Sequence, residues 1–232
     1  MSIEVARIEV GKIGSEVGKV GSFALSLLTG LLFIASLTPI AWAQAAVEGR
    51  QFSRMTPVPV ETGKKIEVIE FFSYSCPHCG EFEPALQDWL KTLPPDVSFR
   101  RVPVMFYPQW TETAKVYYTL EALGEEAKLS PEVFAAIHVK RLALYDPPKF
   151  FDWAASKGLD RKKVEDLYNS FTMSGRINRA KQLAQAYNIQ EVPTMIIDGK
   201  FVTSPGKAGG YANIGPVLSE LVAKARAERP KS

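Results

Sequence analysis

The sequence predicts an α/β fold in which a helical domain is inserted between two segments that contain the β-strands. A nearly continuous run of β-branched and aromatic residues at Ile66–Phe72 is typical of a central strand covered on both faces. Residues 107–186 have helical patterning, and an apolar hairpin sequence follows them. We therefore assign the strand-containing domain to residues 66–106 and 187–232, and the inserted helical domain to residues 107–186.

The first strand leads directly into a predicted helix. Apolar residues between positions 82 and 93 recur at helical spacing, and Pro94 and Pro95 end the pattern. Pro77 suits the first turn of a helix, where its missing N–H is not needed. Cys76 is therefore expected at the N-terminus of this helix.

A second strand is predicted at residues 97–104, and start and stop signals divide the following residues into helices. Thr111 and Glu112 open the first helix, which Gly124 closes. The remaining signals are an opening at Ser130–Pro131, a break at Pro147–Pro148, a stop at Gly158, a cap at Asp160 and a last helix over residues 175–187.

The last part of the chain predicts a β-hairpin and a closing helix. Asp198 and Gly199 form the tight turn between two short apolar runs. A glycine-rich loop is expected at residues 204–210. Residues 214–227 have the apolar spacing of an amphipathic helix.

Residues 1–43 have the pattern of a secretory signal peptide. An apolar stretch at residues 23–37 follows a basic segment, and Ala41 and Ala43 fit the small-residue cleavage pattern. We expect cleavage between Ala43 and Gln44; an uncleaved anchor is the alternative, because the apolar stretch counted through Ala43 is about long enough to span a bilayer. Residues 44–65 are expected to be an irregular lead-in.

Composition narrows the classes of function. The 232 residues include 28 Lys and Arg and 25 Asp and Glu, which gives a net charge of +3. The basic residues are scattered among acidic ones, a distribution that argues against nucleic-acid binding. We expect a globular monomer that does not bind nucleic acid.

The two cysteines, Cys76 and Cys79, form a C-x-x-C pair that follows a buried strand and opens a helix. This context is the thioredoxin-like redox signature. A helix N-terminus favours a thiolate, so Cys76 is the expected nucleophile, exposed, with Cys79 facing inward. The alternatives are a structural disulfide and half of a zinc site, which would need two further ligands when His78 and His138 are the only histidines. We expect no metal.

The sequence FFSYSCPHC at residues 71–79 resembles the active-site strand and turn of the DsbA family of periplasmic disulfide-donating oxidases, with Pro77 and His78 between the cysteines. The resemblance covers nearly the whole chain after residue 43. It implies a thioredoxin fold with an inserted helical domain, and reoxidation by a quinone-linked membrane partner of DsbB type. It also implies that Pro193 is a cis-proline facing the disulfide, and that Val192 offers backbone hydrogen bonds to an extended substrate.

Two supporting residues follow from the same resemblance. Glu70 falls where the family keeps a buried acidic residue under the disulfide, and Arg101 falls near a position that often holds lysine. An arginine does not give up its proton, so a structural ion pair fits this pair better than a proton relay.

The sequence thus predicts a periplasmic thiol:disulfide oxidoreductase whose disulfide, Cys76–Cys79, oxidises exported proteins that contain cysteines, with no other cofactor. His78 and Pro77 are expected to contribute to catalysis. The alternatives are a periplasmic disulfide reductase or isomerase, and a non-catalytic thioredoxin-fold binding protein with a structural disulfide.

Overall fold

The structure is a computed structural model that describes residues 45–230, so the predicted signal peptide and its cleavage site lie outside the described residues. The strands are β1 (Ser53–Arg54), β2 (Ile66–Phe72), β3 (Val97–Pro103), β4 (Thr194–Ile197) and β5 (Phe201–Thr203). The helices are α1 (Pro77–Leu90), α2 (Trp110–Ala122), α3 (Glu126–Phe134), the π-helical turn η1 (Ala135–Val139), α4 (Pro147–Ser156), α5 (Arg161–Tyr168), α6 (Phe171–Ala186), α7 (Pro205–Ala208) and α8 (Tyr211–Glu228). Within the described residues, every helix is too short or too polar to cross a membrane.

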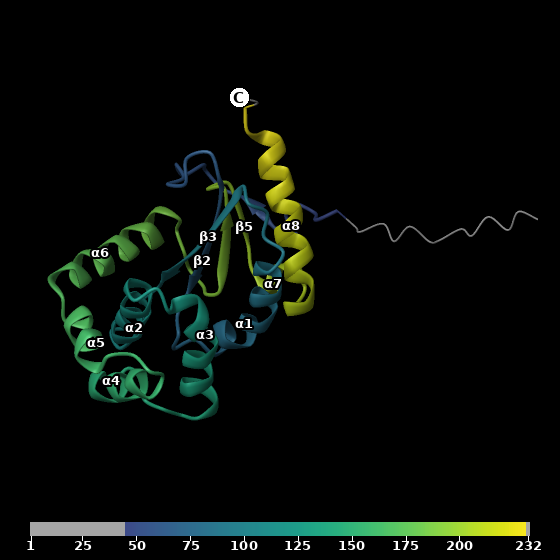
Figure 1. Cartoon of the computed structure of the whole chain (residues 1–232). Helices are drawn as coiled ribbons and strands as arrows, with labels where there is room; N and C mark the ends of the chain where they lie inside the picture. The colour runs from purple at the N-terminus through teal and green to yellow at the C-terminus, as the bar shows by residue number, and fades with distance from the viewer. Residues whose placement is uncertain (1–44, 231–232) are drawn as a thin grey trace, which may run out of the picture. The chain divides into compact units, whose positions relative to one another are not determined.

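The strands form one sheet in the order β1-β5-β4-β2-β3. β2 is parallel to β3 and antiparallel to β4, so it lies inside the sheet, and all seven of its residues are buried. This burial explains its mostly apolar sequence, which only Glu67 and Glu70 interrupt. The helices between β3 and β4 gather on one side of Figure 1, while α8 lies on the other.

Two hydrophobic clusters meet at β2 because successive side chains of a strand point to opposite faces. Val68 belongs to the cluster that includes Leu86 of α1 and Leu218 of α8. Its neighbour Ile69 belongs to the cluster formed with the inserted helices. Glu70 shares the face of Val68, which turns its side chain toward α1.

The inserted helices follow the predicted signals in part. Asp160 caps α5, its side chain accepting a hydrogen bond from the Lys163 N–H at 2.8 Å. The expected opening at Ser130–Pro131 is wrong, since α3 already begins at Glu126 and Pro131 lies inside it. Leu129 faces the core, so the apolar face extends back beyond the proline.

The predicted Asp198-Gly199 turn is confirmed, whereas the expectations for the glycine-rich loop and the lead-in need correction. The Asp198-Gly199 turn joins β4 and β5 with positive φ angles of 53° and 63°, as a tight hairpin requires. The expected glycine-rich loop contains the short helix α7, which Ser204 caps by accepting a hydrogen bond from the Lys207 N–H. The lead-in contains β1, a two-residue strand whose sequence has no strand pattern and whose pairing comes from the edge of β5.

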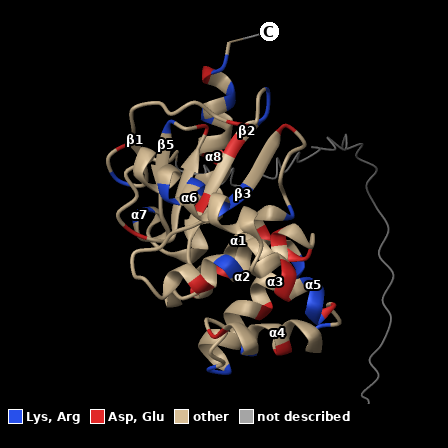
Figure 2. Cartoon of the chain, turned by 90° about the vertical axis from the view of Figure 1, so that its left-hand side faces the viewer, with Lys and Arg blue, Asp and Glu red and all other residues tan. Residues whose placement is uncertain are grey.

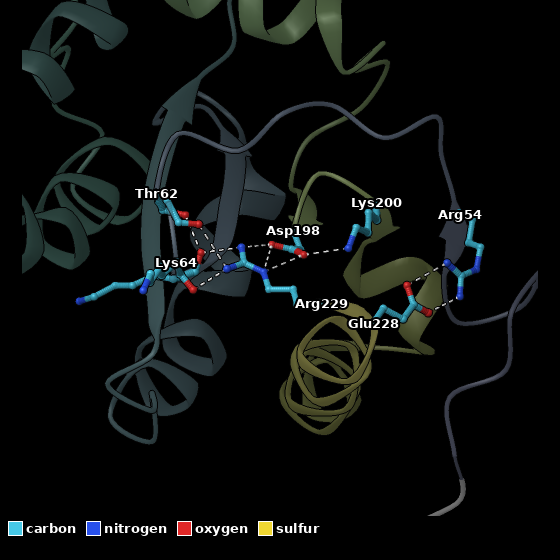
Figure 3. A network of polar contacts seen from close by, with 9 residues as sticks. Arg54, Thr62, Lys64, Asp198, Lys200, Glu228 and Arg229 are labelled. Atoms are coloured by element: carbon cyan, nitrogen blue, oxygen red, sulfur yellow. Dashed lines mark hydrogen bonds and ion pairs between the residues drawn. The ribbon is translucent and has the colours of Figure 1, made fainter. Parts of the chain in front are cut away.

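Arg229, directly after α8, joins the end of the chain to the start of β2 and to the hairpin turn (Figure 3). Its guanidinium donates to the carbonyl oxygens of Gly63, Lys64 and Lys65, and to the carboxylate of Asp198. The Asp198 side chain is only 3% exposed. Its charge is compensated by Arg229 and by Lys200, whose Nζ lies 3.1 Å from a carboxylate oxygen of Asp198.

We predict that Arg229→Ala lowers the free energy of unfolding by about 1–3 kcal/mol, because it leaves Asp198 underpaired in a buried position. The matched control is Arg226→Ala, which removes an ion pair to Asp96 whose two side chains are nearly half exposed. That control should lose less than ~1 kcal/mol. Urea unfolding monitored by circular dichroism measures both values, and equal losses in the two variants would contradict the role of Arg229.

Candidate active site

The turn between β2 and α1 places the two cysteines at the start of the helix. Cys76 is the N-cap residue with extended backbone, and Pro77 opens the helix. The Cys76 N–H donates to the carbonyl of Ser73 at 3.0 Å, and the Cys79 N–H donates to the carbonyl of Cys76 at 3.2 Å. Both thiols are free in this structure, which therefore describes the dithiol form.

The two sulfurs differ in exposure. Cys76 retains 6% of its surface and Cys79 retains 0%. Cys76 is thus less exposed than the sequence led us to expect, because the loop before β4 packs against it: its sulfur lies 3.6 Å from the carbonyl oxygen of Val192. Cys79 is enclosed by the core, as predicted.

The surroundings move the pKa values of the two thiols in opposite directions. The pKa of Cys76 falls from 9.0 to about 6, chiefly because the Cys79 thiol donates to its sulfur, with further donation from the N–H groups of Cys79 and His78. Burial opposes this shift, and the charge of His78 adds to it. Burial raises the pKa of Cys79 well above 9.0. At neutral pH the pair therefore contains one thiolate, on Cys76.

His78 is an exposed residue of the first turn of α1 and contacts two side chains. Its Nδ1 lies 3.1 Å from a carboxylate oxygen of Glu81, and the hydroxyl of Tyr211 donates to the same oxygen at 2.8 Å. The hydrogen bond and the charge of Glu81 raise the pKa of His78. No sequence signal indicates Tyr211, because it belongs to α8, more than a hundred residues away.

The predicted substrate-binding residues lie beside the dithiol. The Val192–Pro193 peptide bond is cis, as the resemblance implied. A groove of about 480 Å³ lies between this bond and the start of α1. It is lined by His78, Glu191, Val192, Pro193, Ser204, Pro205, Gly206, Lys207 and Tyr211.

Glu70 and Arg101 are side by side, because the parallel register of β2 and β3 pairs them directly. The Arg101 Nε donates to Glu70 at 2.7 Å, and both side chains are buried. The same guanidinium also donates to Glu83 of α1 at 2.6 Å and to Glu126 of α3 at 2.7 Å. Glu83 lies four residues after Cys79, a spacing that puts both on one helix face, whereas no sequence signal indicates Glu126.

The active-site turn is also held by the inserted helices. Tyr74 is buried, its hydroxyl lies 2.6 Å from the Ser130 hydroxyl, and its carbonyl lies 2.8 Å from the Nε2 of His138. The hydroxyl of Ser75 lies 3.0 Å from that of Thr113. His138 thus supports the segment that precedes the cysteines. Residues 45–230 contain no group of three His, Cys, Asp or Glu side chains arranged to hold a metal ion.

Known proteins share this sequence and fold. Residues 67–208 match the DSBA-like thioredoxin domain family. The thiol:disulfide interchange protein DsbA of Bordetella parapertussis is 40% identical over 195 residues, which cover 83% of this chain and 93% of that protein. The DsbA of Pseudomonas aeruginosa is 40% identical over 208 residues, covering 88% and 98%.

Among solved structures, the crystal structure of Pseudomonas aeruginosa DsbA superposes with a TM-score of 0.74 at 39% identity, and covers 78% of this chain and 95% of that chain. The predicted fold, a thioredoxin fold with an inserted helical domain, is confirmed by this agreement. With a C-x-x-C dithiol at the start of α1 and relatives matched along most of its length, the chain belongs to the DSBA-like thioredoxin domain family and is a thiol:disulfide oxidoreductase.

Proposed function

We propose that this oxidoreductase works in the periplasm as an oxidase, which donates the Cys76–Cys79 disulfide to exported proteins that contain cysteines. The observation that supports this direction is the lowered pKa of Cys76, about 6. A thiolate that is stable at neutral pH favours the dithiol over the disulfide, so the disulfide readily accepts electrons. Each pKa unit below the ambient pH adds about 1.4 kcal/mol, or roughly 30 mV for a two-electron couple.

The proposed reaction has two exchanges. A client thiolate attacks the Cys76 sulfur, the Cys76–Cys79 bond breaks, and Cys79 takes the electron pair and then a proton. A second client thiolate attacks the client sulfur of the mixed disulfide and releases Cys76 as a thiolate. The client loses two electrons and the enzyme gains them. The low pKa of Cys76 makes it a good leaving group in the second exchange.

The difference in exposure supports the choice of sulfur. Cys79 has no exposed surface, while Cys76 keeps 6% and its sulfur lies 3.6 Å from the carbonyl oxygen of Val192, which lines the groove, so a client reaches Cys76 first. Val192 and Pro193 border the same groove and would align the client as an extended segment through backbone hydrogen bonds. Backbone pairing disregards side-chain identity, which suits an enzyme with many clients.

The remaining parts of the proposal come from the sequence and the family. Residues 1–43 would direct export, and cleavage near Ala43 would release a monomer into the periplasm. The enzyme would need no cofactor beyond its own disulfide, and a quinone-linked membrane oxidase of DsbB type would restore that disulfide. Figure 2 shows acidic and basic residues interspersed over the inserted helices, which agrees with the mild net charge.

We predict that Cys79→Ala accumulates mixed disulfides with client proteins, because the Cys76 thiolate can still exchange with client disulfides and the sulfur that would resolve the mixed disulfide is gone. Cys76→Ala should accumulate none. Non-reducing gel electrophoresis of periplasmic extracts, with free thiols blocked by acid quenching and alkylation, measures both variants. Trapping by Cys76→Ala alone would reverse the two roles.

We predict that the reduction potential changes its dependence on pH near pH 6, the pKa of Cys76. Below this value reduction takes up two protons and the potential falls by about 59 mV per pH unit; above it, Cys76 stays ionised and the slope is ~30 mV per unit. The lowered pKa also means that the thiolate stabilises the reduced folded enzyme fully above pH 9 and loses this contribution as pH falls through 6. Equilibration with glutathione between pH 4.5 and 8 tests the slope, and a constant ~59 mV per unit would refute the assignment.

We predict that His78→Ala raises the pKa of Cys76 and lowers the reduction potential, but by less than about one unit and ~30 mV. The effect is limited because the variant removes the imidazole charge and keeps the backbone N–H that donates to Cys76. Thiolate absorbance at 240 nm against pH, together with the glutathione equilibrium, provides the measurement. Lys91→Ala, which removes an exposed charge at the far end of α1, is the control and should change neither quantity.

A further inference from the structure

Arg101 binds more carboxylates than it can neutralise. Its guanidinium donates from Nε to Glu70 at 2.7 Å, from Nη2 to Glu83 at 2.6 Å and from Nη1 to Glu126 at 2.7 Å. These carboxylates come from β2, α1 and α3, and the guanidinium itself is 1% exposed. If all three were ionised, the cluster would have a net charge of −2 in a nearly water-free site.

A buried charge without a partner costs several kcal/mol, so a carboxyl group in the cluster keeps its proton. Glu126 accepts a second hydrogen bond, from the hydroxyl of Ser130 at 2.9 Å, and its side chain is 19% exposed. Glu83 accepts a second hydrogen bond from Gln87 at 2.8 Å. Glu70 is fully buried, and its Oε1 has no hydrogen-bond partner. Glu70 is therefore the group that holds the proton.

We propose that Glu126, on the inserted helical domain, is a positioning residue that draws on the charge of Arg101 and thereby leaves Glu70 as a neutral acid beneath the disulfide. Without Glu126, Arg101 would serve two carboxylates instead of three, and Glu70 would ionise more easily. The role of Glu126 is indirect, because it touches Arg101 and Ser130 but neither cysteine.

The consequence for the reaction rests on the proposed function. When a client attacks Cys76, the electron pair of the broken bond goes to Cys79, whose sulfur has no exposed surface. A charged Glu70 would oppose this new thiolate, since its charge acts on Cys79 and raises the pKa of that thiol. A neutral Glu70 removes the opposition. The inserted domain would thus assist the first exchange from a distance.

The other groups around Glu70 favour the same assignment. Burial is the main cause that raises the pKa of Glu70. The charge of Arg101 lowers this pKa, and the charges of Glu83 and Glu126 raise it further. From β4, the residue paired with Glu70 is the uncharged Met195. The charge on Glu126 also raises the pKa of the buried Tyr74, after burial itself, which keeps that phenol neutral.

The test compares Glu126→Gln with two other variants in the mature protein, which is reduced for the first measurement and oxidised for the second. Glutamine keeps the size of the side chain and an oxygen that can accept from Arg101, but it removes the charge. Glu126→Asp retains a charge and should restore wild-type behaviour. Glu132→Gln is the matched control, because it removes a charge from the same helix at a partly exposed site paired with Lys157.

The first measurement is the ¹³C NMR titration of the Glu70 side-chain carboxyl carbon, assigned by its loss in Glu70→Gln. We expect the Glu70 midpoint to fall by about one pH unit in Glu126→Gln, the size typical of a nearby charge, and to stay in place in Glu126→Asp and Glu132→Gln. A midpoint unchanged in Glu126→Gln, or a wild-type Glu70 already ionised at neutral pH, would overturn the proposal.

The second measurement is the rate at which dithiothreitol reduces the Cys76–Cys79 disulfide, corrected for the thiolate fraction of the reductant. The corrected rate should begin to fall about one pH unit lower in Glu126→Gln than in wild type, following the ionisation of Glu70. A shifted NMR midpoint with an unshifted rate profile would refute the effect on the exchange. Failure of the proposed oxidase function would instead appear as an absence of client oxidation while the NMR shift remained.

Discussion

The architecture around the dithiol depends on the burial of one guanidinium. Arg101 lies at the centre of an interaction that joins β2, β3, α1 and α3, and its side chain is only 1% exposed. Burying this charge is tolerable only because carboxyl groups from the strand β2, the active-site helix α1 and the inserted helix α3 pack against it, so the guanidinium links these three elements. The cysteines lie at the start of α1, the helix that also carries Glu83.

A strand that ends beneath a helix N-terminus explains the asymmetry between the cysteines. The N-cap position exposes the Cys76 sulfur to backbone N–H groups, whereas one turn later Cys79 has rotated into the core. The two positions within one helix turn therefore give the two thiols opposite pKa shifts. The Cys79 thiol lowers the pKa of Cys76 most, the backbone N–H groups lower it further, and the charge of His78, which is exposed and bound to Glu81, adds to this effect.

Local patterns were sufficient to predict most of the fold. The central strand, the helix after Pro77, the Asp198-Gly199 turn and the cap at Asp160 each depend on residues that are close in sequence. The start of α3 was missed, because Leu129 is buried by tertiary packing that overrides the signal of Pro131. The pairing of β1 with β5 was missed for a similar reason.

The site residues that belong to a sequence motif could be predicted. Those that depend on contacts between residues far apart in the sequence could not. The C-x-x-C pair and the resemblance led to Cys76, Cys79, Glu70 and Pro193. The contacts of Tyr211 and Glu126 arise only after α8 and α3 have packed against α1, so no spacing in the sequence reveals them.

The enclosure of Cys79 also determines how long a client remains attached. After the first exchange, the reduced Cys79 stays beside the mixed disulfide and can close the ring on Cys76 again, in a step that needs no collision. A client is oxidised only if its own second cysteine arrives before this ring closure. Proteins whose cysteines are far apart would be released unchanged. The rate at which Cys79 closes the ring would therefore select clients whose two thiols lie close together.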